Sequence, residues 1–493
     1  MTAKQVIVVG SGNAALCAGI AALEKGAEVL MVEKAPEAEA GGNSRYTAGA
    51  MRFVYQSNEE LHPLLLQPDD ERIPHTEFGA YPAETFTQDL LNFNDGRPLS
   101  LHQQILIRES YPTMRWLADH GVKFEPIYSR QSFEKDGKYI FWGGLTLAAE
   151  GEGVGLVAAE MQVFLQLGGQ VAYETEAREL VLEQGKVCGL RCLQNGERIT
   201  LSADAVILGS GGFEASPAMR KKFMGEHWAK SKVRGTPHNT GQGIEMALQA
   251  GAVFHGIPDG CHAVPMDLHM PDNGNLNIPY IERKHYRKIC YFLGIMLNAE
   301  GHRFVDEGKN FRNYTYAQFG RAILHQAGNF AWQIFDQKVD ELLYSEYRFW
   351  DASFVQADTL EELVSKLDGV DQQQAMQTIQ AYNQAVDPAT PFDPTILDGK
   401  GTQGLELNKT NWANKLDTPP FKAYPVTCGI TFTYGGLKVD QSAAVLNASD
   451  QRIPGLFACG ELVGGVFYHG YPGGSGLTSG AVFGRLAGYA AAE

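Results

Sequence analysis

The stretch Gln5-Val6-Ile7-Val8-Val9-Gly10-Ser11-Gly12-Asn13-Ala14-Ala15 decides the fold. Residues 5–9 form a short, mostly β-branched apolar run, which predicts a buried strand. The glycines then open an apolar-periodic helix that ends near Glu24, and Gly26 follows as a helix stop. Residues 28–34 predict a second strand. This order of strand, helix and strand indicates a parallel α/β sheet.

The turn between the first strand and the helix has the spacing of a dinucleotide-binding site. Gly10 permits a tight turn, Gly12 lets the backbone approach a pyrophosphate, and Ala15 allows the helix to pack closely on the strand. The helix N-terminus then presents its unsatisfied N–H groups to the phosphates. Glu33, at the end of the second strand, is placed to accept hydrogen bonds from ribose hydroxyls. A glycine-rich structural turn is the alternative.

The composition sets the class of protein and excludes some partners. A chain of 493 residues predicts two or three domains. With 41 basic and 57 acidic residues, the net charge is 41 − 57 = −16, which argues against nucleic acid and against anionic membranes as partners. The 55 glycines make up about 11% of the chain, against ~7% on average, and much of the excess lies in a few clusters.

The N-terminal sequence, the lack of a long apolar run and the cysteine spacing predict a cytoplasmic protein. The N-terminus carries no signal-peptide pattern, and the sequence has no apolar run of the length that a transmembrane segment needs. The seven cysteines have no CxxC spacing, so we expect reduced thiols and neither haem nor an iron–sulfur cluster. They are Cys17, Cys188, Cys192, Cys261, Cys290, Cys428 and Cys459.

The glycine clusters and two further segments resemble the fumarate reductase and succinate dehydrogenase flavoprotein family over nearly all of the chain. The segments that carry this resemblance are 41–44 (GGNS), 209–212 after the predicted strand 205–208, 298–307 (NAEGHRFVDE), 455–461 (GLFACGE) and 464–488. The resemblance implies FAD as the cofactor. The membrane members carry FAD covalently on a His in a Ser-His-Thr loop, whereas this chain has Ser44-Arg45-Tyr46-Thr47, so we expect noncovalent FAD.

The resemblance and the nucleotide motif together predict a set of cofactor-binding residues. They are Gly10, Gly12, Asn13, Ala14, Ala15, Glu33, Lys34, Gly41, Gly42, Asn43, Ser44, Thr47, Ala48, Gly49, Ala177, Gly209, Ser210, Gly211, Gly212, Asn239, Gly243, Gly460, Glu461, Ser475, Gly476 and Leu477.

Within the family, the chain is most similar to tricarballylate dehydrogenase-like flavoproteins. This similarity is carried by segments 10–17, 41–44, 429–434 and 435–440, with weaker support from 234–236 and 261–262. The chain departs from a plain fumarate reductase at three places. Phe311 stands where the family's proton-carrying Arg is expected, four residues after Glu307. Residues 431–433 replace a His, and Tyr471 replaces a substrate-binding Arg.

Tyr471-Pro472-Gly473-Gly474 instead resembles the flavoprotein 3-ketosteroid dehydrogenases, in which a Tyr near this motif polarises the ketone. Their base is a Tyr in a Tyr-x-x-Phe-x-Arg context, which residues 316–321 match. Because tyrosine has an intrinsic pKa near 10, a base role for Tyr316 needs a nearby cation, and Arg312 or Arg321 could supply it. A packed tyrosine with a satisfied hydroxyl is the alternative.

The predicted catalytic residues are therefore Tyr316, Tyr471, Arg312 and Arg321, and the predicted substrate-binding residues are His262, Thr433, Tyr434, His469 and Gly474. We predict no metal site. The basic run 283–288 is either a solvated face or a carboxylate-recognition element.

The expected fold is α/β, with a discontinuous Rossmann-like FAD-binding domain (1–254 and 423–493) and an inserted α+β capping domain (255–422). The expected activity is FAD-dependent dehydrogenation, or the reverse reduction, of a CH–CH bond next to a carboxylate or ketone. Tricarballylate-like polycarboxylates are the leading substrate class, and ketones, steroidal or smaller, are the alternative. The expected partners are a small-molecule substrate and an external electron acceptor. A flavoprotein electron-transfer subunit that needs a redox partner is the alternative of another class.

Overall fold

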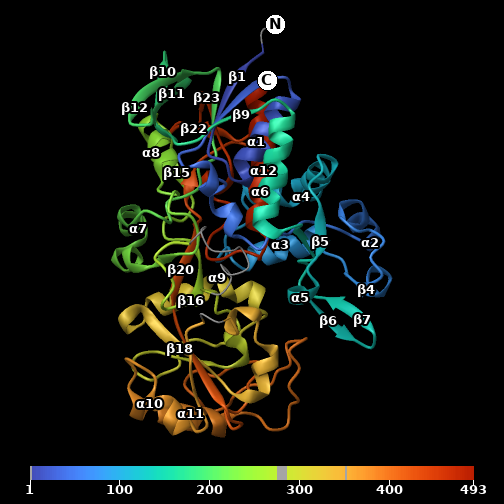
Figure 1. Ribbon diagram of the computed structural model, residues 1–493, viewed down its shortest axis with the longest axis vertical. Helices are drawn as coiled ribbons and strands as arrows, with labels where there is room; N and C mark the ends of the chain where they lie inside the picture. The colour runs from blue at the N-terminus through green and yellow to red at the C-terminus, as the bar shows by residue number, and fades with distance from the viewer. Residues whose placement is uncertain (1–2, 275–285, 350–351) are drawn as a thin grey trace. The chain divides into compact units, whose positions relative to one another are not determined.

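The chain forms two compact units in a computed structural model that describes residues 3–274, 286–349 and 352–493 (Figure 1). The first unit comprises residues 1–225, 235–261 and 432–493, and the second comprises 226–234 and 262–431. The domain limits predicted from the sequence were 254/255 and 422/423. The assignment of these parts to an FAD-binding domain and a capping domain stays a prediction.

A six-stranded sheet forms the centre of the first unit, in the order β22-β23-β13-β1-β2-β9. Neighbouring strands from β23 to β9 run parallel, and only β22 is antiparallel to its neighbour. All four residues of β13 are buried, as expected for a parallel sheet covered on both faces. The strands are β1 (Gln5–Val9), β2 (Glu28–Val32), β9 (Gln170–Ala172), β13 (Ala205–Leu208), β22 (Ala444–Leu446) and β23 (Arg452–Ala458).

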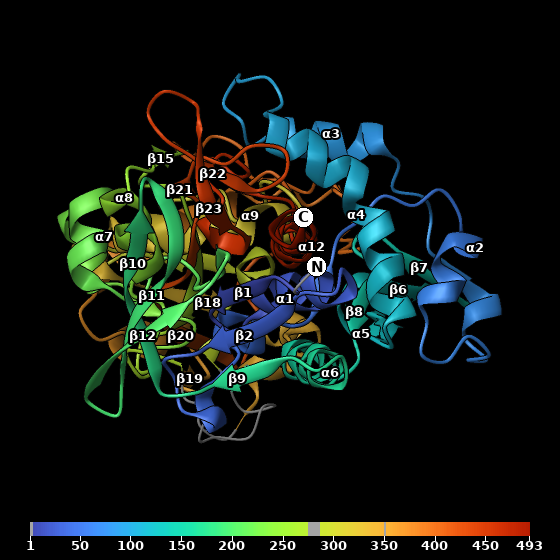
Figure 2. The ribbon, with the colours of Figure 1, turned by 90° about the horizontal axis from the view of Figure 1, so that it is seen from above.

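Three long helices of the first unit pack together beside this sheet (Figures 1 and 2). They are α1 (Asn13–Glu24), α6 (Glu152–Gln166) and α12 (Ser475–Ala492). Helices α1 and α12 touch backbone to backbone: a Cβ placed on Gly484 would lie 2.3 Å from the Ala14 oxygen. This close approach explains why the last helix is rich in glycine and alanine.

The remaining elements of the first unit surround this centre. The strands are β10 (Thr175–Glu183), β11 (Lys186–Gln194) and β12 (Glu197–Ser202) in an antiparallel sheet, β3 (Ala50–Met51) with β8 (Leu147–Ala149) and β5 (Phe124–Pro126), β4 (Thr76–Glu77) with β7 (Lys138–Phe141) and β6 (Ser132–Lys135), and β15 (Phe254–His255) with β21 (Gly436–Leu437). The helices are α2 (Asn58–Leu61), α3 (Ala83–Leu91), α4 (Leu101–Asp119), α5 (Tyr128–Gln131), α7 (Pro217–Met224) and α8 (Gln242–Gln249).

The second unit is built on a mixed sheet around the long strand β20 (Phe421–Thr433). The other strands are β14 (Lys232–Val233), β16 (Cys261–Asp267), β17 (Ile295–Leu297), β18 (Phe330–Phe335) and β19 (Val355–Ala357). Its helices are α9 (Arg312–Leu324), α10 (Leu360–Ser365) and α11 (Gln372–Ala385). The first unit has an α/β architecture and the second has an α+β architecture, which confirms the fold class expected from the sequence.

The second half of the basic run 283–288 corrects one alternative. Residues 283–285 lie outside the described residues, but Arg287 and Lys288 are buried and are not part of a solvated face. Arg287 Nη2 lies 2.5 Å from a carboxylate oxygen of Glu346, and Lys288 Nζ lies 3.6 Å from Asp267. These are internal ion pairs, so Arg287 and Lys288 serve packing within the second unit.

All seven cysteines are free, and all except Cys188 are buried. Across residues 3–274, 286–349 and 352–493, no helix has the length and the apolar character needed to cross a membrane.

Candidate functional site

The turn after β1 has the features that a dinucleotide site requires. Gly10 has a φ of +100°, and a Cβ there would lie 2.6 Å from the Gly209 oxygen, so only glycine fits between β1 and β13. Gly12 is the N-cap of α1 and gives the helix no side-chain cap. The α1 N-terminus therefore keeps backbone N–H groups for an anionic ligand.

Glu33 is buried at the end of β2 and is held in a fixed position. Its Oε2 accepts a hydrogen bond from the Ser11 hydroxyl at 2.5 Å, and its Oε1 accepts one from the Ala35 N–H at 2.8 Å. Ser11 in turn accepts from the Gly41 N–H at 2.9 Å. A buried carboxylate with free lone pairs at this strand end suits a ribose diol.

The loop 41–44 is fastened to α1 and to the segment 235–239. Ser44 Oγ accepts a hydrogen bond from the Asn13 N–H at 3.1 Å, and Asn43 Oδ1 accepts one from the Thr236 N–H at 2.8 Å. A Cβ on Gly235 would lie 2.1 Å from Asn43 Oδ1, so this position needs glycine. These contacts bring together segments that are about 200 residues apart in the sequence.

Glu461 follows β23 and lies against the glycine patch after β13. Its Oε1 accepts hydrogen bonds from the Thr433 N–H at 2.6 Å and from the Thr433 hydroxyl at 2.8 Å. A Cβ on Gly212 would lie 2.0 Å from the same oxygen. Burial raises the pKa of Glu461. Thr433, predicted to touch substrate, is thus engaged with a predicted cofactor residue.

The other predicted cofactor residues also lie in the first unit. Lys34 Nζ donates to Thr240 Oγ1 at 2.8 Å and to Gln242 Oε1 at 3.0 Å, and burial lowers its pKa. Asn13 Nδ2 donates to the Leu477 oxygen at 2.9 Å, in the first turn of α12. Ala177 lies on β10 and Gly243 on α8.

These residues fit a bound flavin dinucleotide. The Ser210 hydroxyl, beside the patch after β13, is buried and has no hydrogen-bond partner within the described parts of the chain. A buried polar group of this kind is costly unless a ligand satisfies it. Together with the remaining N–H groups in the first turn of α1 and the carboxylate of Glu33, this hydroxyl provides groups for phosphate, ribose and ring. The individual cofactor assignments stay predictions.

Tyr471 belongs to an aromatic cluster of the first unit. Its ring centroid lies 5.2 Å from that of Phe432, 5.3 Å from Phe467 and 6.4 Å from Tyr434. Rings at these distances and tilts stabilise one another beyond their buried area. The cluster forms an apolar wall with a phenol in it.

Two other predicted substrate residues have different surroundings. His469 is partly exposed, and its Nε2 lies 3.8 Å from Asp95 and 3.4 Å from Arg97 Nη1. Gly474 is the N-cap of α12 with φ +89°, and a Cβ there would lie 2.4 Å from Leu145. Both have structural partners, and their substrate roles stay predictions.

A second cluster, in the second unit, surrounds Arg312 at the first position of α9. Arg312 is buried, and its guanidinium lies 5.3 Å from the Tyr344 ring centroid and 5.9 Å from that of Tyr316. Its Nε and Nη2 have no hydrogen-bond acceptor among the residues described. No carboxylate of the described chain lies within 4 Å of it. Because a buried cation is costly without a partner, these N–H groups are available to an anion or a carbonyl oxygen.

His262 extends this cluster. Its ring packs edge-on against Tyr316, with 4.9 Å between centroids. Burial, and then the charge of Arg234, lower its pKa well below the usual range, so the imidazole is neutral. Two arginines thus flank a neutral His and a Tyr within one unit.

Arg321 packs against a tryptophan of the second unit. Its guanidinium packs over the Trp228 ring at 5.9 Å. Of the two cations that the sequence offered to Tyr316, the structure brings Arg312 against the phenol ring. A catalytic role for Arg321 stays a prediction.

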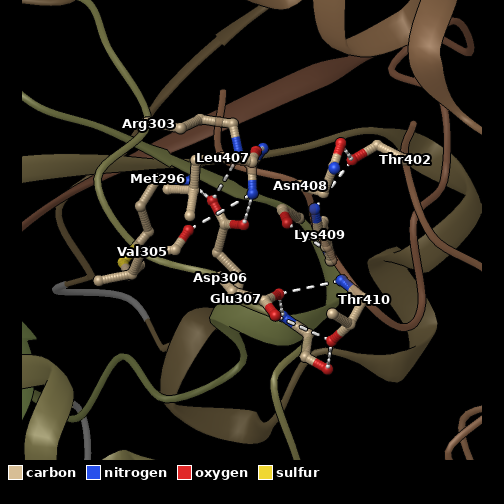
Figure 3. A network of polar contacts seen from close by, with 12 residues as sticks. Met296, Arg303, Val305, Asp306, Glu307, Thr402, Leu407, Asn408, Lys409 and Thr410 are labelled. Atoms are coloured by element: carbon tan, nitrogen blue, oxygen red, sulfur yellow. Dashed lines mark hydrogen bonds and ion pairs between the residues drawn. The ribbon is translucent and has the colours of Figure 1, made fainter. Parts of the chain in front are cut away.

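The segment that leads into α9 is held by a buried polar network (Figure 3). Arg303 donates to both oxygens of Glu307, at 3.1 and 2.5 Å, and Glu307 Oε1 also accepts from the Met296 N–H at 2.8 Å. Lys409 Nζ donates to the Phe292 and Gly294 oxygens at 2.7 and 2.6 Å. Burial lowers the pKa of Lys409 to about 8, and Glu307 opposes that shift.

Sequence reasoning missed three parts of these sites. Tyr344 and Lys409 had no motif, because only the tertiary fold brings them to Arg312 and Glu307. Glu214 carried a usable signal, since it comes two residues after the glycine patch at 209–212, in the manner of Glu33 and Glu461 after their strands.

Comparisons with known proteins agree with a flavin dinucleotide site. The family model described as "FAD binding domain" matches residues 5–477. The NADH:acrylate oxidoreductase of Vibrio harveyi is 27% identical over 99% of this chain and 50% of its own length, so the chain spans half of that protein. A probable fumarate reductase of Shewanella frigidimarina is 28% identical over 99% of this chain and 75% of its own length.

Two further matches extend the range of chemistry. The 3-oxosteroid 1-dehydrogenase of Mycolicibacterium smegmatis is 26% identical over 98% of this chain and 96% of its own. The open conformation of a flavocytochrome c3 fumarate reductase superposes with a TM-score of 0.72 and 25% identity, over 99% of this chain and 78% of that one.

Proposed function

Because the chain belongs to the FAD binding domain family, with FAD as its cofactor, we propose that it moves a hydride and a proton across a carbon–carbon bond next to a carboxylate or ketone. When bound, the flavin supplies the hydride acceptor or donor. The reaction therefore needs a proton carrier and polar groups on the carbonyl oxygen from the protein. We propose that FAD is noncovalent, since the loop 44–47 has no His.

The observation that carries this proposal is the buried Arg312, whose Nε and Nη2 atoms have no hydrogen-bond acceptor among the described residues. The sequence comparison put Phe311 at the place of the family's proton-carrying Arg, and Arg312 is the next residue. Since guanidinium is protonated at all ordinary pH values, it is a proton donor that is always loaded in the reducing direction. We assign proton transfer to Arg312 together with Tyr316, whose ring centroid lies 5.9 Å from the guanidinium, and substrate-oxygen binding to neutral His262.

Carboxylates are the leading substrate class, because the second unit places both Arg312 and Arg234 around His262 and Tyr316. Arg offers bidentate geometry to a carboxylate. The NADH:acrylate oxidoreductase and the fumarate reductase act, by their names, on unsaturated carboxylates. Tricarballylate-like polycarboxylates remain within this class as the most highly charged members.

A ketone is the second candidate, and the aromatic cluster of Tyr471 favours it. A phenol among Phe432, Phe467 and Tyr434 suits an apolar ring with one carbonyl oxygen. The similarity to a 3-oxosteroid 1-dehydrogenase points to the same chemistry.

Anaerobic flavin spectroscopy tests both candidates and the electron-transfer alternative. The oxidised protein is mixed with tricarballylate and cyclic ketones, and the reduced protein with acrylate, fumarate and a 3-oxosteroid-1-ene. Bleaching or reoxidation without any partner protein supports a complete half-reaction on the chain. No spectral change with any of these compounds would instead favour an electron-transfer subunit that needs a redox partner.

Two variants test the proton carrier. Arg312→Lys and Arg312→Met are expected to slow the substrate half-reaction by about 10²–10⁴-fold while FAD absorbance stays normal. Arg191→Met, in an exposed pair with Glu179 on β11, is the matched control. A half-reaction of Arg312→Met within threefold of wild type would remove Arg312 from proton transfer.

A further inference from the structure

Glu214 is a buried acid of the first unit that neither the motifs nor the proposed reaction uses. It lies just after the glycine patch at the end of β13 and is fully shielded from solvent. Burying a carboxyl group is costly unless its oxygens are satisfied. Its hydrogen bonds therefore indicate what holds it there.

One oxygen of Glu214 joins three segments that the sequence assigned to the cofactor. Oε1 accepts hydrogen bonds from Asn43 Nδ2 and from Asn239 Nδ2, each at 2.6 Å. Asn43 belongs to the loop 41–44, and Asn239 to the segment before α8. Since Asn43 also accepts from the Thr236 N–H, Glu214 fixes the side-chain orientation of both amides.

The other oxygen of Glu214, the buried Oε2, has no hydrogen-bond donor among the described residues, and a second carboxyl group lies in the same region. Glu461 carries that carboxyl group: a Cβ on Gly212, two residues before Glu214, would lie 2.0 Å from Glu461 Oε1. This oxygen already accepts from Thr433, and the nearby Glu461 contributes to the raised pKa of Glu214. Two ionised carboxylates are acceptors only, so this contact requires one proton between them.

We propose that Glu214 is a positioning residue of the FAD site, and that the Glu214–Glu461 pair holds one shared proton on which the order of the loops around FAD depends. The protonated pair carries one negative charge and keeps both Asn amides on Glu214 Oε1. Loss of the proton leaves two buried charges in contact, which repel each other and release the amides.

The electrostatic surroundings support a shared proton. Burial raises the pKa of Glu214 well above its usual range, and Glu461 adds to this; the pKa of Glu461 is raised by burial too. Two basic side chains of this region have partners other than the Glu214 carboxyl group. Arg220 Nη1 donates to the backbone oxygen of Glu214 at 2.7 Å, and His238, beside Asn239, pairs with Glu39 at 2.9 Å. Within the described chain, no cation lies within 4 Å of either carboxyl group.

The test is the release of FAD from the holoprotein, followed by the rise of flavin fluorescence on dilution between pH 6 and pH 9.5. Because both pKa values are raised, the proton is present at low pH and is lost as pH rises. Wild-type release is therefore expected to accelerate at least tenfold toward high pH, while circular dichroism reports an intact fold.

Glu214→Gln separates the proton from the packing. Its amide keeps one acceptor for the Asn side chains and a permanent N–H donor for Glu461, so its FAD release is expected to be independent of pH. Glu214→Ala removes both the acceptor for the Asn side chains and the donor for Glu461. This variant is expected to release FAD about tenfold faster at every pH. Glu160→Gln, at another buried acid of this unit, is the control and is expected to keep the wild-type pH profile.

Two results would overturn the proposal. One is wild-type FAD release that is flat across this pH range. The other is a Glu214→Gln variant that shows the same acceleration as wild type. Infrared spectra in the Glu160→Gln background give a second readout, because Glu160 is itself a protonated carboxyl group. The protonated-carboxyl band that remains there must disappear in Glu160→Gln/Glu214→Gln, and its persistence in that double variant would place the proton elsewhere.

Discussion

Replacing Glu307 by Gln is expected to destabilise the second unit strongly. Glu307 is fully buried and accepts three hydrogen bonds, two of them from Arg303, whose side chain is only 4% exposed. Removing one charge of a buried pair leaves the other uncompensated, at a cost of roughly 3–5 kcal/mol. At about 2–4 °C per kcal/mol, the loss corresponds to roughly 6–20 °C in Tm.

The effect should also depend on pH through Lys409. The ordinary lysine pKa is 10.5 and that of Lys409 is about 8, a shift of 10.5 − 8 = 2.5. This depressed pKa contributes about 3 kcal/mol of stability above pH 10.5, and that contribution is lost as pH falls toward 8. Glu307 is the main group that opposes the shift, so its removal moves the Lys409 pKa lower and extends the loss to lower pH. Glu307→Gln should therefore cost more at pH 6 than at pH 9.5.

Thermal unfolding, followed by circular dichroism at both pH values, measures the effect. Glu362→Gln makes the same chemical change in an exposed pair with Lys366 and is expected to leave Tm unchanged. In the double variant Glu307→Gln/Arg303→Met, part of the loss should return, because the uncompensated charge is gone. A Tm shift below about 2 °C, or one equal at both pH values, would refute this account of the network.

Two further predictions concern the helices of the first unit. Burial raises the pKa of Glu160 well above its usual range, so its stabilising contribution is present at low pH and is lost as pH rises. Glu160→Gln should therefore gain Tm relative to wild type between pH 5 and pH 9, and a constant difference would contradict a neutral Glu160. Gly484→Ala should lower stability by about 1–3 kcal/mol in denaturant unfolding, since its Cβ would lie 2.3 Å from the Ala14 oxygen. Alanine normally favours a helix over glycine, so an equal or higher midpoint would show that α1 and α12 do not pack this closely.

The parallel sheet could be predicted because its signals are local. Residues 5–9 and 205–208 are short apolar runs followed by glycines, and both are strands of the central sheet. The turn at Gly10 needs a positive φ and a close backbone approach, and only glycine offers both. Such requirements are visible in a sequence because few residue types satisfy them.

The polar sites were less predictable, because their partners are distant in the sequence. Arg312 was recognisable as a candidate, yet its ring contacts with Tyr344 arise from a separate segment of the second unit. The sequence predicts that Arg287 and Lys288 are either solvated or carboxylate-binding. In the structure they form internal ion pairs instead. A charge run in a sequence does not show whether its side chains find partners within the fold.

The same reasoning separates the two kinds of buried charge in this protein. Arg303 and Arg287 are each met by a carboxylate within 2.5 Å, which is what stability alone requires of a buried cation. Arg312 is equally buried but is surrounded by tyrosine rings, and no acid of the described chain neutralises it within 4 Å. Selection for stability would favour a neutral side chain there, because the desolvation cost is not repaid within the unit. A net charge of −16 makes the contrast sharper, since acidic residues outnumber basic ones in the chain as a whole. This contrast supports the proposal that Arg312 meets the negative charge that develops on a substrate oxygen or carbon during the reaction.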